Sequence, residues 1–311
     1  MDIAKIIFET MDKLLNKAYN ESVVIDGADR ITVLTDKKYS QIKKFECTMD
    51  LYFDGEIKTK RPVVFYIHGG GFVAGGKEFR KTLATWYATK GFFVMNVNYG
   101  LSPDCRFPEQ IKHLTSALNW INKNAEKYNL DTKKIVVSGD SAGAYFAAMM
   151  ACVCTSKKLQ EKFGVKTNLK FCACVLNCGL YDLKSVLKKR LAFGLNNKIF
   201  QSVTGIKKID IDSYEFKDFC SPLTLVTKSF PPTFLIYAEK DIFCAGQAEM
   251  LADKLENKDI YFEKFYSTSA FVNHCFSLEW KNKTAEEAME LQEKFLEKIK
   301  KGDLPKRLSE K

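Results

Sequence analysis

The pentapeptide Gly139-Asp140-Ser141-Ala142-Gly143 follows the apolar run Ile135-Val136-Val137 and opens a run of small residues from Ala144 to Ala148. This order predicts a strand that turns sharply into a helix, which is the context of a G-x-S-x-G nucleophile elbow. The flanking glycines add no side-chain bulk, so a serine can stand exposed on such a strained turn. Ser141 is therefore the candidate nucleophile.

Short apolar runs separated by helical stretches continue on both sides of this elbow from residue 62 onward. The alternation is typical of a mostly parallel sheet covered by helices on both faces, hence of an α/β fold. The predicted strands are residues 63–67, 92–97, 135–137, 171–176, 233–238 and 260–265, preceded by two antiparallel strands at 31–35 and 45–53. The predicted helices are residues 78–90, 109–127, 142–154, 243–255 and 285–299.

Two segments fall outside this alternation. An amphipathic helix is predicted at the start of the chain, where Ile6, Ile7, Phe8, Met11, Leu14, Leu15 and Ala18 recur at helical spacing. The second is the stretch between Gly179 and Pro232, which is longer than an ordinary connection and includes Leu191 and Phe193. We expect one domain over residues 1–311, with helical cap elements from 1–25 and 180–230.

The composition narrows the classes of function. The 311 residues are 46% hydrophobic, which suits a globular protein with a substantial core. The 48 lysines and arginines exceed the 38 acidic residues, but they are scattered, so we expect a solvated basic surface and no nucleic-acid partner. The first fifteen residues carry Asp2, Lys5, Glu9, Asp12 and Lys13 and resemble neither a signal peptide nor a membrane span.

The ten cysteines raise the alternatives of disulfides or a metal site. Cys152 and Cys154 form one pair and Cys172, Cys174 and Cys178 cluster nearby, yet neither group has zinc-ribbon spacing. They lie in a predicted helix and a predicted strand, where small thiols pack as hydrophobes. We therefore expect no metal, no cofactor, no integral membrane contact and a reducing, cytoplasmic location.

A serine hydroxyl needs a base, and histidine has the fitting pKa of about 6.5. Of the three histidines, His68 belongs to a glycine-rich loop and His113 lies beside Lys112 on a predicted helix, where we expect it to be solvated. His274 follows the last predicted strand and is the candidate base.

The third role belongs to a carboxylate that orients the histidine. Asp241 follows the predicted strand at 233–238, so it should lie at the carboxyl edge of the sheet, and Glu239 is its nearest rival. The order Ser141, Asp241, His274 agrees with the chain order expected for an elbow of this kind.

A glycine-rich loop, His68-Gly69-Gly70-Gly71-Phe72, follows the predicted strand at 63–67. Its backbone N–H groups can hold an oxyanion without interference from side chains. A phosphate loop is disfavoured because the Gly-Lys-Ser/Thr ending is absent: Gly76-Lys77 is followed by Glu78.

Together the HGGGF and GDSAG motifs, Asp241, the His274-Cys275-Phe276 segment and Ser221-Pro222-Leu223 resemble the hormone-sensitive-lipase-like family of α/β-hydrolases over about residues 60–280. The resemblance implies an eight-stranded sheet with a cap built from the amino-terminal segment and an insertion after the sixth strand. It also implies that Ser141, His274 and Asp241 act together and that the amides of Gly70, Gly71 and Ala142 form the oxyanion hole. His68, with Gly69 and Phe72, would support the loop.

Three departures from the family pattern stand out. Gly100 replaces the arginine of a Tyr-Arg-Leu-Ala-Pro-Glu segment, Lys112-His113 occupies the place of an acidic pair, and Ala144 stands where a second glycine usually follows the elbow. These positions affect packing around the site, so they bear on substrate range more than on activity.

The sequence thus predicts a carboxylic ester hydrolase that acts on short to medium acyl chains through an acyl-enzyme. A small-molecule ester is the expected partner, and a homodimer is an open alternative for the assembly. The alternatives are an arylformamidase-type amidase with the same triad, and a catalytically silent small-molecule-binding protein of this fold.

Overall fold

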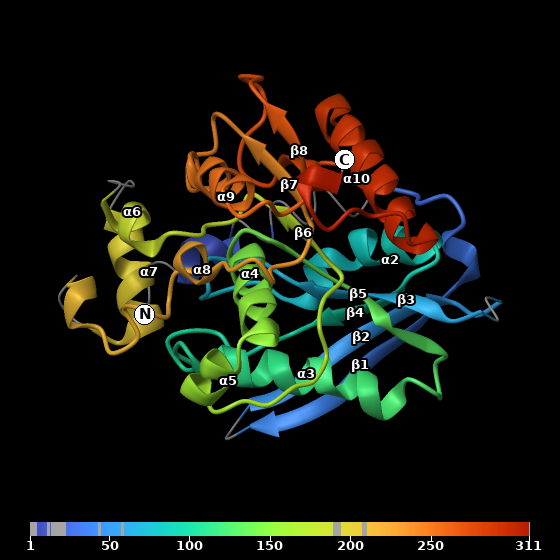
Figure 1. The fold of residues 1–311 in the computed structure, drawn as a ribbon, viewed down its shortest axis with the longest axis horizontal. Helices are drawn as coiled ribbons and strands as arrows, with labels where there is room; N and C mark the ends of the chain where they lie inside the picture. Colours follow the sequence, from blue (N-terminus) through green and yellow to red (C-terminus); the bar gives the residue numbers. More distant parts are fainter. Residues whose placement is uncertain are drawn as a thin grey trace.

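The computed structural model describes residues 5–10, 13, 23–42, 45–56, 59–188, 194–206 and 210–310. Its centre is an eight-stranded sheet in the order β1-β2-β4-β3-β5-β6-β7-β8 (Figure 1). The strands are β1 (Ile31–Ile42), β2 (Phe45–Asp54), β3 (Arg61–Ile67), β4 (Phe93–Val97), β5 (Leu130–Asp140), β6 (Ala173–Asn177), β7 (Thr233–Ala238) and β8 (Phe262–Ser267).

The sheet is mostly parallel. β2 runs antiparallel to both β1 and β4, whereas all the pairings from β4 through β3, β5, β6 and β7 to β8 are parallel. The carboxyl ends of the parallel strands align, since Ile67 pairs with Gly139, and Asp140 pairs with Asn177. Loops that follow these strands therefore meet at one edge, where α/β sheets gather their sites.

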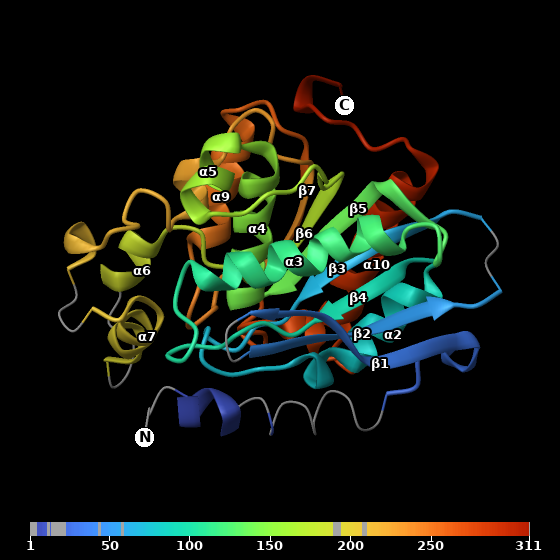
Figure 2. The same ribbon diagram turned by 90° about the horizontal axis from the view of Figure 1, so that it is seen from below.

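Helices cover both faces of the sheet (Figure 2). Helices α3, α4 and α9 pack with one set of alternating strand residues, and α2 and α10 pack with the other set. The arrangement confirms the predicted α/β-hydrolase architecture. The α-helices are α2 (Lys81–Thr89), α3 (Glu109–Asn124), α4 (Ala142–Thr155), α5 (Lys157–Phe163), α6 (Leu183–Lys188), α7 (Leu195–Thr204), α8 (Pro222–Leu225), α9 (Gln247–Glu256) and α10 (Lys283–Lys301), and the short 3-10 helices are η1 (Ala28–Arg30), η2 (Lys77–Arg80), η4 (Ile211–Ser213), η5 (Phe276–Leu278) and η6 (Leu308–Glu310).

The helix after the elbow is unusually apolar. Every residue of α4 from Ala142 to Cys154 is buried, because the helix lies between the sheet, α3 and α8. Cys152 and Cys154 are thus part of the hydrophobic core. All ten cysteines are free thiols.

The insertion between β6 and β7 contains α6, α7, η4 and α8. The helical residues 5–10 lie against its α7, where Phe8 packs with Leu195, Val73 and Ala74 (Figure 2). Of the residues expected to build the first helix and the insertion, Met11, Leu14, Leu15, Ala18, Leu191 and Phe193 lie outside the described residues.

Several boundaries differ from the expected ones. Strand β1 continues to Ile42, beyond the expected end at residue 35, as an exposed partner of β2. Helix α5 was not expected, because its short sequence is mostly polar. Helix α9 begins at Gln247, after Gly246 in a left-handed conformation, and not at residue 243. No helix within the described residues combines the length and apolar character that a bilayer span requires.

Candidate active site

Ser141 lies at the sharp junction between β5 and α4. Its φ of 53° and ψ of −121° are strained for a residue with a side chain. A Cβ atom on Gly143 would overlap the carbonyl oxygen of Ile67 in β3, so only glycine allows the helix to start so close to the neighbouring strand. The geometry is that of the predicted elbow, and it presents the serine hydroxyl above the sheet edge.

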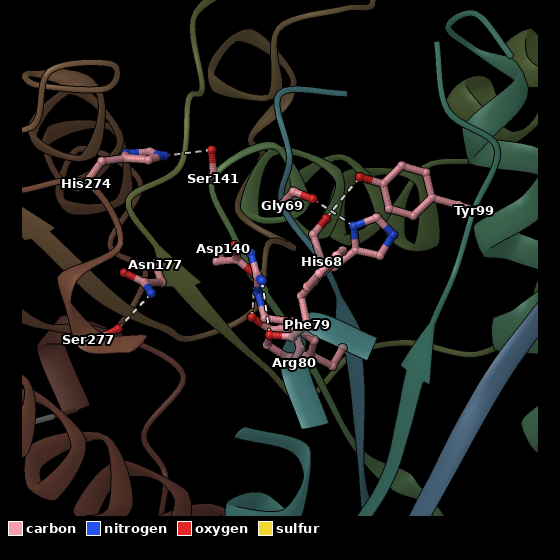
Figure 3. Close-up of polar contacts among 11 residues, drawn as sticks. His68, Gly69, Phe79, Arg80, Tyr99, Asp140, Ser141, Asn177, His274 and Ser277 are labelled. Atoms are coloured by element: carbon pink, nitrogen blue, oxygen red, sulfur yellow. Dashed lines mark hydrogen bonds and ion pairs between the residues drawn. The ribbon is translucent and has the colours of Figure 1, made fainter. Parts of the chain in front are cut away.

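The structure brings together the three residues predicted to act as a triad. The Ser141 hydroxyl lies 2.8 Å from Nε2 of His274, to which it can donate (Figure 3). Nδ1 of His274 lies 2.9 Å from each carboxylate oxygen of Asp241. The Nδ1–H group therefore points at the carboxylate and leaves Nε2 free to accept the serine proton.

Asp241 is held by more than His274. Its Oδ1 atom accepts hydrogen bonds from the amides of Phe243 at 2.9 Å and Cys244 at 2.8 Å. Burial raises the pKa of this carboxyl, but His274 and the two amides outweigh burial and the pKa is lowered. The rival Glu239 is exposed and lies 3.6 Å from Nζ of Lys240. Asp241 is thus the carboxylate in contact with the imidazole.

The glycine loop faces the elbow. Gly70 and Gly71 have φ values of 122° and 59°, and the carbonyl of Gly70 accepts from the amides of Val73 and Ala74. Within the described residues, neither the Gly70 amide nor the Gly71 amide donates to a protein acceptor. Ala142 is the first residue of α4, where amides have no partner inside the helix. These three amides are free to bind a ligand oxygen.

His68 is buried inside the loop rather than directed at Ser141 (Figure 3). Its Nδ1–H donates to the carbonyl of Gly69 at 2.7 Å, and its own carbonyl accepts from the Tyr99 hydroxyl at 2.9 Å. The imidazole stacks on the Tyr99 ring at 4.5 Å between centroids. Burial is the main cause that lowers the pKa of His68 to about 4, so the ring is neutral at pH 7.

Phe72 anchors the other end of the loop. Its ring packs edge-on against Tyr145 and Phe146 of α4, at 5.2 and 5.4 Å between centroids. Gly69 has no room for a side chain because a Cβ atom there would overlap Asp140. The loop is therefore fixed against the elbow from both ends.

An ion pair lies beneath the elbow that was not predicted from the sequence. Nε of Arg80 lies 2.9 Å from Oδ1 of Asp140 and its Nη2 lies 2.6 Å from Oδ2 (Figure 3). The Tyr66 hydroxyl donates to the same Oδ1 atom at 2.5 Å. Burial raises the pKa of Asp140, but Arg80 and Tyr66 outweigh it and the pKa is lowered. The charged carboxylate next to Ser141 is thus neutralised by a residue of η2, for which the sequence offered no local signal.

A second link joins the elbow to the loop that carries His274. The Ser141 amide donates to the carbonyl of Asn177 at 2.8 Å, and the Asn177 side chain donates to the Ser277 hydroxyl at 2.7 Å (Figure 3). The end of β6 therefore connects Ser141 to the loop that carries His274.

The expected solvation of His113 is wrong. The side chain is buried, its Nδ1 accepts from the Gly100 amide at 3.0 Å, and its ring lies 5.5 Å from that of Phe45. Helix α3 turns this face inward because Ile111, Leu114 and Ala117 pack on the sheet. The sequence suggested an exposed His113 only because the neighbouring Lys112 is charged.

A narrow, largely apolar cavity of about 70 Å³ opens beside Ser141. The hydroxyls of Tyr145 and Tyr214 in its wall donate to backbone carbonyls, of Cys220 at 2.8 Å and Phe107 at 3.1 Å, so the wall offers carbon surface to a ligand. The apolar lining includes Phe8 of the N-terminal helix, Phe72 of the glycine loop, Leu183, Val186 and Leu187 of α6, Ile199, Phe200 and Val203 of α7, and Phe243.

Comparison with known proteins places this site in a family. A model of the BD-FAE family matches residues 49–255. The chain belongs to the BD-FAE family. The membership agrees with the α/β-hydrolase fold and confirms the predicted relationship to hormone-sensitive-lipase-like proteins.

Relatives of the chain are esterases by name. An acetyl esterase of Salmonella schwarzengrund is 29% identical over 195 residues, which are 59% of this chain and 56% of that relative. The match thus spans little more than half of the relative's length. Esterase B of Lactobacillus rhamnosis has a TM-score of 0.83 at 22% identity, covering 96% of this chain and 95% of its own, and has also been solved inhibited by a tributyrin phosphonate. A bacterial heroin esterase has a TM-score of 0.75 at 22% identity, covering 95% of this chain and 90% of its own.

Proposed function

We propose that the protein hydrolyses carboxylic esters with short to medium acyl chains, using Ser141, His274 and Asp241. The observation that carries the proposal is the continuous hydrogen-bonded line from the Ser141 hydroxyl through His274 to Asp241, at 2.8 and 2.9 Å. A serine aligned in this way has a base for its proton, and the base has a carboxylate that fixes its tautomer.

The reaction proceeds in two halves. Ser141 Oγ attacks the ester carbonyl while Nε2 of His274 takes the hydroxyl proton, and the negative oxygen that forms is bound by the amides of Gly70, Gly71 and Ala142. Collapse of this intermediate breaks the ester C–O bond, and His274 returns the proton to the departing alcohol. Water then attacks the acyl-enzyme with His274 as general base and releases the acid. Every group that takes part belongs to this chain, and the steps need no metal or cofactor.

The acyl group is assigned from the cavity beside Ser141. Its narrow, apolar walls favour a hydrocarbon of limited length over a charged or extended acid. The names of the relatives, acetyl esterase and an esterase inhibited by a tributyrin phosphonate, are consistent with short chains.

We further propose that helical residues 5–10 together with α6 and α7 form a cap over this cavity, within a single domain. Phe8 and the apolar residues of α6 and α7 supply the part of the wall that the sheet and its helices do not. The ten free thiols support a reducing, cytoplasmic location.

Turnover of p-nitrophenyl esters from acetyl to palmitoyl tests the proposal. Ser141→Ala should lower kcat on the order of 10⁶-fold, as for other triads. The rate should be highest for acetyl to hexanoyl esters. Undiminished hydrolysis by Ser141→Ala would refute the role of the serine, and a preference for palmitoyl esters would refute the assigned chain length.

Two further measurements separate the alternatives. A higher kcat/KM on formyl-kynurenine than on p-nitrophenyl butyrate would identify an amidase with the same triad. Failure of a fluorophosphonate probe to label Ser141 in folded protein would indicate a silent binding protein, whereas labelling that Ser141→Ala abolishes supports a hydrolase.

A further inference from the structure

Two cysteines lie close to the proposed base and do not line the cavity beside Ser141. Cys275 follows His274 directly in the chain, and Cys178 follows the last residue of β6. The two sulfur atoms and a ring nitrogen of His274 all lie within 4.8 Å of one another. Residues distant in sequence thus place two thiols and an imidazole around one point.

Both cysteines adopt a backbone conformation that is unfavourable for residues with a side chain. Cys178 has a φ of 47° and Cys275 a φ of 55°. A non-glycine residue in this region costs of order 1–3 kcal/mol, and such residues concentrate at functional sites. Glycine would satisfy both positions without this cost. The two strained positions bear neighbouring thiols.

The surrounding hydrogen bonds hold the thiols in place. The amide of Cys178 donates to the carbonyl of Ile236 in β7 at 2.8 Å. The adjacent Asn177 donates to Ser277 at 2.7 Å, which ties the end of β6 to the segment that contains His274 and Cys275 (Figure 3). Because both segments are anchored, the three potential ligands are already assembled.

We propose that Cys178, Cys275 and His274 form an inhibitory binding site for a thiophilic divalent cation, represented by Zn²⁺. Two thiolates and one imidazole are a favourable ligand set for this ion, and water completes a four-coordinate site. Tetrahedral coordination requires ligand atoms roughly 3.6–3.8 Å apart, from metal–ligand distances of about 2.0–2.3 Å. The preassembled group reaches this spacing by contracting no more than about 1.2 Å.

Binding replaces protons by the metal without any redox step. Each thiol loses its proton to solvent and donates a sulfur lone pair, so Zn²⁺ uptake releases two protons. Burial raises the pKa of both thiols, but a coordinated thiol is deprotonated outright. Whichever ring nitrogen of His274 binds the metal, it loses its bond to Ser141 or to Asp241. A filled site therefore stops hydrolysis.

The loss of activity rests on the proposed role of His274, but metal binding does not. Isothermal titration of the protein with Zn²⁺ should give one site per chain. Turnover of p-nitrophenyl butyrate should fall as that site fills and should return on addition of EDTA. Co²⁺ in the same site should show thiolate charge-transfer absorption, which reports ligation independently of activity.

Single substitutions locate the site. Cys178→Ser and Cys275→Ser should each weaken Zn²⁺ binding by more than the 10–100-fold expected for loss of an outer partner, and should leave turnover without metal unchanged. Cys275→Gly removes the same ligand and also removes the backbone strain at this position. It replaces Cys275→Ser in the test if the serine variant folds poorly. Cys172→Ser is the matched control, because Cys172 precedes the opposite end of β6. It should bind like the wild type.

Several results would overturn the proposal. Wild-type affinity in both cysteine variants would exclude these ligands, and a loss confined to Cys244→Ser would move the site to the neighbouring group of Asp241, Cys244 and His274. Recovery with a phosphine reductant but not with EDTA would identify a disulfide instead. Absence of Zn²⁺ binding in a protein whose hydrolysis depends on Ser141 would refute the metal site and leave the hydrolase proposal intact.

Discussion

The backbone amide of Gly100 donates a hydrogen bond to Nδ1 of the buried His113 at 3.0 Å. These are two of the positions at which the sequence departs from the family pattern, where an arginine and an acidic pair are usual. Gly100 has no side chain to contact His113, and the imidazole accepts from its backbone amide. The two departures therefore contact each other directly, at the residue that follows Tyr99.

This arrangement should make Gly100 intolerant of even a methyl group. A Cβ atom there would lie 2.6 Å from Sγ of Cys105 and 2.8 Å from Cε1 of His113. We expect Gly100→Ala to lower the free energy of unfolding by about 1–3 kcal/mol, the usual cost of overpacking. Urea denaturation measures it. Gly55→Ala is the control, because a Cβ atom at Gly55 meets only Thr32 at 3.4 Å and should change stability little. Equal stabilities of the two variants would contradict the prediction.

The carboxylate in the proposed triad can be identified by comparing two neighbours. Asp241→Asn should lower kcat by about 10⁴-fold, because an amide no longer fixes the imidazole tautomer or stabilises its charge. Glu239→Gln removes an exposed carboxylate two residues earlier and should leave kcat within about twofold of the wild type, as expected for a group outside the triad. Steady-state kinetics on p-nitrophenyl butyrate make the comparison. The reverse ranking would transfer the role to Glu239.

The sequence was most informative where burial made the pattern simple. Strand β3 is buried along almost its whole length, so residues 63–67 read as a continuous apolar run. Ser141 and Asp241 could be placed because each follows a buried run of this kind, in β5 and β7, whereas β8 before His274 is only partly buried. The polar edge strand β1 has no such pattern: most of its residues are exposed, and its extension to Ile42 could not be predicted.

Contacts between segments far apart in the chain could not be predicted from the sequence, for a different reason. Arg80 is paired with Asp140, and Cys178 lies beside Cys275, only because parallel strands bring their ends to one edge of the sheet. Neither pair has a local spacing that marks it. The burial of His113 was missed because its neighbour Lys112 faces outward, and a helix face is assigned from several residues together.

The ion pair beneath the elbow should be important for stability. Arg80→Met would leave the carboxylate of Asp140 buried without its cation, and breaking a buried pair in this way costs about 3–5 kcal/mol. The double variant Arg80→Met with Asp140→Asn should recover part of this loss, because the uncompensated charge is gone. Urea denaturation of both singles and the double gives the coupling energy. Lys112→Met, which breaks a surface pair with Glu109, is the control and should cost at most about 1 kcal/mol. A fully additive double variant would show that the two side chains do not interact.

His68 should make the protein less stable as the pH falls. Its pKa is about 4 in the folded protein against 6.5 for an ordinary histidine, so between these values the unfolded chain binds a proton that the folded chain does not. The stabilisation is complete above pH 6.5 and is lost toward pH 4, in total about 3 kcal/mol at 1.36 kcal/mol per pH unit. His68→Asn keeps a donor toward Gly69 but does not titrate. The free energy of unfolding of this variant should therefore fall less steeply than that of the wild type between pH 6.5 and 4. Parallel pH profiles of the two proteins would show that the pKa of His68 is not lowered by folding.

Phe8 should control access to the acyl cavity. Its ring covers Gly71, lies 5.9 Å from Phe243 between centroids and forms part of the cavity wall. Phe8→Ala removes apolar surface that contacts the substrate equally before and during reaction, so KM for p-nitrophenyl butyrate should rise roughly tenfold with little change in kcat. The kcat/KM of longer acyl esters should rise relative to that of butyrate, because alanine leaves more room on that side of the cavity. Ile6→Ala is the control, since Ile6 lies in the same helical segment with 39% of its surface exposed and does not line the cavity. A fall in kcat at unchanged KM would instead mean that Phe8 acts by holding Gly71 in position for the oxyanion, because that interaction matters only in the transition state.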